Sequence, residues 1–194
     1  MRWKVHRQRT LYQSDWVNVE VADVELPDGR RLDHHVLRMH RQSASAAVID
    51  DHQGRVLMLW RHRFITDRWG WELPCGWVNP GEDPAEATRR EVLEETGWEP
   101  GTLKLLCSYG ADVGISDARF HLYQADGATW QGPPVDNTEA TRVAWIPLSE
   151  VRELLNRGLV DDAASITALL YLLAFAPIGT AMKPGEPVPE AGAS

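Results

Sequence analysis

Three glutamates crowd the end of an acidic segment, GWVNPGEDPAEATRREVLEETGW (residues 76–98), which holds six carboxylates. On a helix that turns about 100° per residue, Glu91, Glu94 and Glu95 fall within roughly a 100° arc and form one acidic face. Repulsion between solvated carboxylates one turn apart costs only about a few tenths of a kcal/mol, so a solvated helix would tolerate them. Mg²⁺ offers a second explanation, because it takes oxygen ligands from carboxylates and from substrate phosphates. The residue types therefore allow either a solvated face or a metal site for phosphate chemistry.

A helix must carry this acidic face, and the sequence marks both of its ends. Asp83 is a good N-cap, Pro84 suits the first helical position, and Glu86 would complete a capping box with Asp83. Gly97 stands where a helix commonly ends in the left-handed conformation. The sequence therefore predicts a helix from Pro84 up to Gly97.

The spacing within this segment resembles the signature of the Nudix hydrolase superfamily at all nine constrained positions. These are Gly76, Glu82, Arg90, Glu91, Val92, Glu94, Glu95, Gly97 and Trp98. The resemblance implies that Glu91 and Glu95 are the principal metal ligands, supported by Glu94, Glu82 and the backbone carbonyl of Cys75. It implies Mg²⁺ as cofactor, with Mn²⁺ as a possible substitute. In such enzymes the metal ions bridge a diphosphate and activate the water that attacks phosphorus.

The resemblance also implies a catalytic group made of Glu94, Glu95 and Arg90, together with a carboxylate from a later loop. Arg90 would pair bidentately with a neighbouring carboxylate and fix its rotamer. Glu139 is the better candidate for the later base or extra ligand, because its spacing to RVAWI matches that of the family. Asp136 is the other acid of this loop. Both could equally be solvated loop acids.

Outside the signature the chain resembles the ADP-ribose pyrophosphatase branch of the superfamily, loosely, over residues 1–176. WRHRF (60–64) stands where that branch has a Gln-aromatic-Arg element, and WELPCG (71–76) stands where it has ELPAG. The resemblance implies that Arg63 binds a substrate phosphate, with Arg61 in place of the glutamine and Glu72 near the nucleotide. A structural salt bridge is the alternative role of Glu72. The loop VGISDARF departs from the branch, because it keeps Asp117 but has Ala118 where a glutamate is common.

The elements around the site predict an α/β chain. The segments 16–26 and 31–38 should pair as a hairpin about the turn PDGR, and strands are expected at 44–50, 55–62, 103–109, 119–125 and 141–147. Helices are expected from the PLSEVRELLNRG segment and at 161–176. The resemblance implies a Nudix fold, an α/β/α sandwich with a mixed sheet, plus an N-terminal antiparallel sheet. We divide the chain into a strand-rich segment that dimerises (1–42), a hydrolase domain (43–176) and a disordered tail (177–194).

Composition limits the functions that remain. A formal net charge of −8 over 194 residues argues against a general nucleic-acid surface. No apolar run reaches the roughly 18 residues of a membrane span, and the start lacks the apolar block of a secretory signal. The two cysteines, Cys75 and Cys107, do not suggest a disulfide framework or a zinc site. We expect a cytoplasmic protein, and the resemblance implies a homodimer that acts on a nucleotide-derived small molecule.

The leading hypothesis is a Mg²⁺-dependent pyrophosphohydrolase that cleaves a nucleoside diphosphate linked to another moiety, such as ADP-ribose or a nucleotide sugar. Its products would be a nucleoside monophosphate and a phosphorylated second half. Alternatives are a nucleotide-sensing regulator without catalysis, a hydrolase of nucleoside triphosphates, and a diphosphate isomerase that would use a reactive Cys75. A small packing role is the plainer reading of that cysteine.

Overall fold

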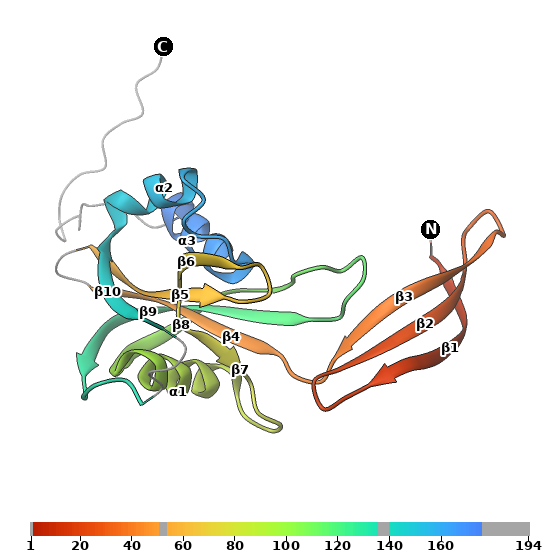
Figure 1. Ribbon diagram of the computed structural model, residues 1–194, viewed down its shortest axis with the longest axis horizontal. Coiled ribbons are helices and arrows are strands. Elements are labelled where there is room, and N and C mark those ends of the chain that lie inside the picture. The colour runs from red at the N-terminus through yellow and green to blue at the C-terminus, as the bar shows by residue number, and fades with distance from the viewer. Residues whose placement is uncertain (1, 51–53, 136–139, 176–194) are drawn as a thin grey trace, which may run out of the picture.

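The protein divides into an N-terminal sheet and a larger layered body, as seen in a computed structural model that describes residues 2–50, 54–135 and 140–175. The N-terminal sheet has three antiparallel strands in the order β1 (Lys4–Gln13), β2 (Val17–Glu25) and β3 (Arg31–Met39). It extends to one side of the body (Figure 1). The predicted β2–β3 hairpin is confirmed, and Gly29 makes its turn with φ of 86°.

The body is built on a seven-stranded mixed sheet. Its main path runs β10-β5-β4-β9-β8, with β6 paired to β5 and β7 paired to β4. Only the pairing of β4 with β9 is parallel among the described strands. The strands are β4 (Ser43–Asp50), β5 (Arg55–Arg63), β6 (Arg68–Glu72), β7 (Cys75–Trp77), β8 (Trp98–Gly110), β9 (Arg119–Trp130) and β10 (Arg142–Pro147).

Helices cover both faces of this sheet. Helix α1 (Pro84–Thr96) lies on one face, whereas α2 (Leu148–Asn156) and α3 (Ala163–Phe175) lie on the other (Figure 1). Strand β4 is therefore buried along most of its length and reads as a run of small and apolar residues rather than an alternating pattern. This arrangement confirms the predicted α/β/α sandwich with a mixed sheet.

Helix α1 begins and ends where the sequence predicts. The Asp83 carboxylate accepts a hydrogen bond from the Ala85 amide at 2.8 Å, so the cap bond goes to that amide rather than to the Glu86 amide of a capping box. Gly97 has φ of 76°, and its amide donates to the Leu93 carbonyl at 2.8 Å. A methyl group at Gly97 would overlap the carbonyl oxygen of Gly132, so glycine is required both by the backbone and by its neighbour.

Two expectations fall outside the described residues, namely the tail 177–194 and the loop carboxylates Asp136 and Glu139. Within the described ranges, no helix is long and apolar enough to cross a membrane.

Candidate active site

A cavity of about 270 Å³ lies beside the C-terminal half of α1, next to β7 and the end of β5. Its wall contains Arg63, Cys75, Gly76, Trp77, Glu91, Glu94 and Glu95. The helix supplies the three carboxylates because residues one turn apart share a face. One cavity therefore brings together the three clustered glutamates, the Cys75 position and the arginine that the sequence assigned to substrate.

Arg90 binds three of the signature carboxylates. Its Nε and Nη2 atoms donate to the two Glu82 oxygens at 3.0 and 3.1 Å, while Nη1 donates to Glu91 at 2.7 Å and Glu94 at 3.2 Å. Nη2 also donates to the Trp77 carbonyl at 2.9 Å. The hydrogen bonds from Arg90 lower the pKa of Glu82, and the Glu82 carboxylate in turn raises the pKa of Arg90. Arg90 thus ties α1 to its preceding loop and to β7.

Glu95 points inward from α1 and is only 5% exposed. Its Oε1 accepts a hydrogen bond from Arg61 Nη2 at 2.6 Å, and its Oε2 accepts one from the Cys75 amide at 2.9 Å. Both contacts come from strands of the sheet beneath the helix. A buried carboxylate requires such partners, because desolvation strongly disfavours an unpaired charge.

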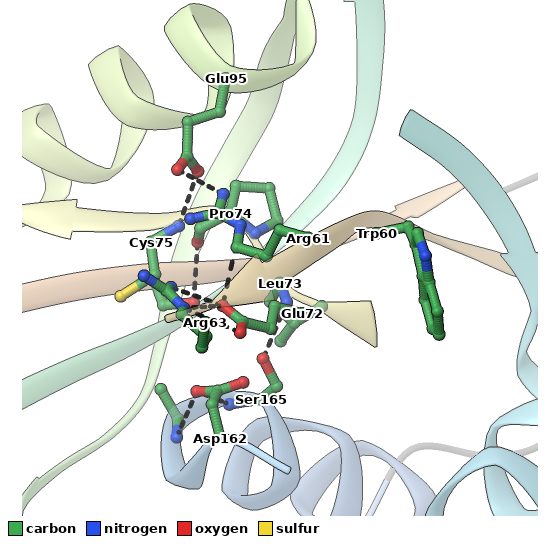
Figure 2. A network of polar contacts seen from close by, with 12 residues as sticks. Trp60, Arg61, Arg63, Glu72, Leu73, Pro74, Cys75, Glu95, Asp162 and Ser165 are labelled. Carbon is green, nitrogen blue, oxygen red and sulfur yellow. Dashed lines mark hydrogen bonds and ion pairs between the residues drawn. The ribbon is translucent and has the colours of Figure 1, made fainter. Parts of the chain in front are cut away.

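Alternating charges continue from Glu95 across the sheet. Arg61 Nε lies 3.8 Å from Glu72 Oε2, and Arg63 binds Glu72 through Nε at 2.9 Å and Nη2 at 2.5 Å. Figure 2 shows Glu95, Arg61, Glu72 and Arg63 in succession, and we call these four residues the charge ladder. The ladder begins at the buried Glu95 and ends at the Arg63 side chain, which is half exposed.

Helix α3 anchors the segment between β6 and β7 that leads into Cys75. The Ser165 hydroxyl accepts a hydrogen bond from the Leu73 amide at 2.8 Å (Figure 2). Ser45 of β4 donates to the Pro74 carbonyl at 2.8 Å. Asp162 caps α3 by accepting from the Ser165 amide at 3.1 Å, and burial raises the pKa of its carboxyl group. The segment next to the cavity is therefore held from the opposite face of the sheet.

Two small residues shape the cavity wall. A methyl group at Gly76 would overlap the Glu91 carboxyl group, so this glycine leaves the space in which that carboxylate lies. Burial raises the pKa of the Cys75 thiol, and the nearby Asp162 and Glu95 carboxylates raise it further. The thiol is therefore protonated at neutral pH.

The carboxylates share a cavity but converge less than expected. Across the described ranges, no three His, Cys, Asp or Glu side chains stand close enough together to hold a metal ion as they are placed. The physical reason is that Arg90 and Arg61 already bind the carboxylate oxygens. The donor set still fits Mg²⁺ in kind, because the Glu91, Glu94 and Glu95 carboxylates offer hard oxygens around one cavity.

Four of the residues singled out in the sequence lie outside the cavity wall, and each is held by a partner elsewhere. Glu82 is drawn to Arg90 and to the Asn79 amide instead of into the cavity wall. Arg61 lies beneath the cavity, 2% exposed, and Glu72 forms the salt bridge that was one of its two alternatives. Asp117 contacts the N-terminal sheet, where it accepts a hydrogen bond from the Met39 amide at 2.8 Å.

Sequence reasoning missed the pairing of Arg61 with Glu95, although a signal for it exists. Side chains on a strand alternate, so Arg61 shares a face with Leu57, which packs beside Val92 of α1. An arginine on that face, with α1 above it, indicates a carboxylate partner on the helix.

This fold and site define a Nudix hydrolase. The family model described as NUDIX domain matches residues 39–170, and the chain belongs to that family. A second model, Nucleoside diphosphate sugar hydrolase N-terminal domain, matches residues 3–37 and so covers most of the three-stranded sheet.

Two relatives and one solved structure carry names of hydrolases that act on nucleotide compounds. The chain is 41% identical over 185 residues to the CMP-5'-(N-acetyl-N-hydroxy-3-aminopropyl)phosphonate hydrolase of Streptomyces rubellomurinus, covering 95% of this chain and 88% of that protein. It is 26% identical over 171 residues to the ADP-ribose pyrophosphatase of Bacillus subtilis, covering 87% and 91%. A crystal structure of an ADP compounds hydrolase shares the fold, with a TM-score of 0.80 at 20% identity over 90% and 94% of the two chains. These findings agree with the predicted class, a hydrolase of a nucleoside diphosphate joined to another moiety.

Proposed function

We propose that the protein hydrolyses the diphosphate of a nucleoside diphosphate linked to a second group, ADP-ribose or a nucleotide sugar, and releases a nucleoside monophosphate and a phosphorylated product. The observation that carries this proposal is that Glu91, Glu94 and Glu95 line the same cavity as Arg63. Carboxylates on one side suit a divalent cation, and a half-exposed guanidinium suits a phosphate oxygen. The two together match a metal-bound diphosphate.

The proposed metal ligands are Glu91, Glu94 and Glu95, with Glu82 and the Cys75 carbonyl in support. Mg²⁺, or Mn²⁺ in its place, would neutralise charge on the diphosphate and activate the attacking water. Arg90 orients the carboxylates that it binds. When an ion is bound, Glu91 and Glu94 must share their oxygens between it and Arg90.

Arg63 is the proposed phosphate-binding residue at the substrate end of the charge ladder. Glu72 accepts three hydrogen bonds from it and so limits the rotamers that its guanidinium can adopt. Arg61 supports the site from below through Glu95. Glu139 is the proposed base or additional ligand, and it lies outside the described residues.

A nucleoside monophosphate joined to a phosphonate is a second candidate substrate. It is favoured by the name of the Streptomyces relative, a CMP-phosphonate hydrolase, with which this chain shares 41% identity. A P–O–P link between a nucleotide and a phosphonate presents the metal and Arg63 with oxygens like those of a diphosphate. A substrate panel should therefore include both classes.

Activity is expected to require a divalent cation and to release a nucleoside monophosphate. We would measure kcat/KM with Mg²⁺ and with Mn²⁺ on ADP-ribose, nucleotide sugars, CMP-phosphonates and nucleoside triphosphates, and identify the products. Full activity after exhaustive chelation would contradict the metal-dependent mechanism. Orthophosphate or pyrophosphate release from triphosphates alone would assign the chain to another class of hydrolase.

The alternatives predict different products. A nucleotide sensor would bind panel members without releasing a product. An isomerase would convert its substrate without releasing a monophosphate, and a reactive Cys75 would need a thiolate at neutral pH. The raised pKa of this buried thiol disfavours that role.

A cytoplasmic location is also part of the proposal.

The N-terminal sheet is the proposed dimer interface. All of β1 is exposed, and Val5, Leu11, Tyr12 and Trp16 lie in or next to it as exposed apolar side chains. A second subunit would cover this surface. Light scattering is expected to give twice the 21.8 kDa mass of one chain. A monomer at working concentrations would contradict the dimer while leaving the hydrolase proposal intact.

A further inference from the structure

The buried Arg61 contacts Glu95, one of the carboxylates of the candidate metal site. Its side chain is 2% exposed, and it donates to Glu95 at 2.6 Å while standing 3.8 Å from Glu72. Glu95, which contacts Arg61 (Figure 2), also forms part of the cavity wall, whereas Arg61 does not. A fixed positive charge therefore lies just beneath the surface on which a cation would bind.

Burial makes this charge effective. Charges in a protein interior interact several times more strongly than in water, because little solvent separates them. An arginine guanidinium is a permanent positive charge in proteins. The guanidinium offsets the negative charge of Glu95 and would repel a cation that approaches the same carboxylate.

The ion pairs at and behind the cavity carry a net charge that one divalent cation would neutralise. The charge ladder, together with Arg90 and the carboxylates that it binds, contains the carboxylates of Glu72, Glu82, Glu91, Glu94 and Glu95, and the guanidiniums of Arg61, Arg63 and Arg90. Five negative and three positive groups leave two negative charges, which one divalent cation neutralises. Without Arg61 the same group would carry three negative charges.

We propose that Arg61 is a positioning residue that serves as a built-in counter-cation for Glu95, so that the substrate-free site takes one divalent ion. A further ion would then require the negative charge of the diphosphate itself. This inference rests on the proposed metal site. It adds two statements: only a limited number of ions bind before substrate, and Arg61 sets that limit.

The test is a titration of the full-length protein with MnCl₂ without substrate, following free Mn²⁺ by electron paramagnetic resonance and heat by calorimetry. Wild-type protein is expected to bind one ion per chain. Arg61→Gln keeps a hydrogen-bond donor for Glu95 but removes the charge, so its affinity for the first ion should rise at least about tenfold. A wild-type stoichiometry of two, or an Arg61→Gln affinity within about threefold of wild type or weaker, would overturn the proposal.

Two further variants separate charge from geometry. Arg61→Lys keeps the charge, so its Mn²⁺ affinity should stay within about threefold of wild type, and a tenfold gain would contradict the proposal. Arg55→Gln removes a partly buried arginine from the same strand, where it pairs with Asp50 at 2.5 Å, and controls for net charge. A tenfold gain with Arg55→Gln would show that net charge, not Arg61, sets the affinity. If Arg61→Gln does not fold, the wild-type stoichiometry and Arg61→Lys still decide the matter.

Activity distinguishes this inference from the proposed function. Arg61→Gln should reach half of its maximal turnover rate at a lower Mg²⁺ concentration than wild type, because its first ion binds more tightly. A protein that binds no Mn²⁺ and releases no monophosphate from any panel member would contradict the proposed function itself. A protein that hydrolyses the panel normally but shows an unchanged metal affinity in Arg61→Gln would contradict only the inference.

Discussion

Glu95→Gln is expected to lower kcat/KM by at least about 10³-fold, because the amide loses the negative charge that a divalent cation requires. The structure adds a cost in stability. Arg61 would lose its partner carboxylate at 2.6 Å, and removing one member of a buried ion pair destabilises by roughly 3 kcal/mol. The protein should still fold, since glutamine fills the same space. Steady-state kinetics and urea unfolding measure the two effects separately.

Glu99→Gln is the matched control for this substitution. Glu99 lies at the start of β8 just beyond α1, and it pairs with Arg89 at 2.9 Å outside the cavity. Glu99→Gln removes one negative charge from the same region as Glu95→Gln, and it should leave kcat/KM near the wild-type value. Wild-type turnover by Glu95→Gln, or an equal loss in Glu99→Gln, would exclude Glu95 as a metal ligand.

Gly76→Ala is expected to reduce kcat/KM by about 10²-fold, because the added methyl group would displace the Glu91 carboxylate and a shift of about 1 Å at a catalytic group has this effect. The displaced carboxylate would also lose its present contact with Arg90 Nη1, which measures 2.7 Å. Kinetics over a range of Mg²⁺ concentrations should show a lower kcat. They should also show that half-maximal activity requires a higher Mg²⁺ concentration.

Gly114→Ala controls for the general effect of adding a methyl group. A methyl there would meet only ordinary contacts, with its nearest atom, Asp112 Oδ1, at 3.6 Å. If Gly76 acts through Glu91, the double variant Gly76→Ala/Glu91→Ala should be no slower than Glu91→Ala alone. An additive loss in the double variant would show that Gly76 acts in another way.

Local signals in the sequence were sufficient for much of the fold. Asp83, Pro84 and Gly97 define α1 because caps depend on residues within one turn of each other. The turn after β2 likewise depends on Gly29 and its immediate neighbours. The grouping of Glu91, Glu94 and Glu95 around one cavity follows from helical spacing alone.

The contacts between residues far apart in the sequence could not be predicted in the same way. Arg90 had several carboxylates within reach, and only the folded loop places both Glu82 oxygens against it. Strand β8 begins at Trp98, earlier than its apolar pattern indicates, because it pairs with β9 along its length despite Pro100. Such pairings depend on elements brought together by the tertiary fold, which local propensity does not describe.

The charge ladder also limits how this enzyme can change over evolutionary time. Each of its inner members neutralises a neighbour inside the sheet, so the loss of one leaves another charge buried and uncompensated. A neutral residue at position 61 therefore costs stability unless position 95 or 72 changes as well, and position 63 is linked to position 72 in the same way. Among related sequences, these positions are expected to covary as pairs instead of drifting singly.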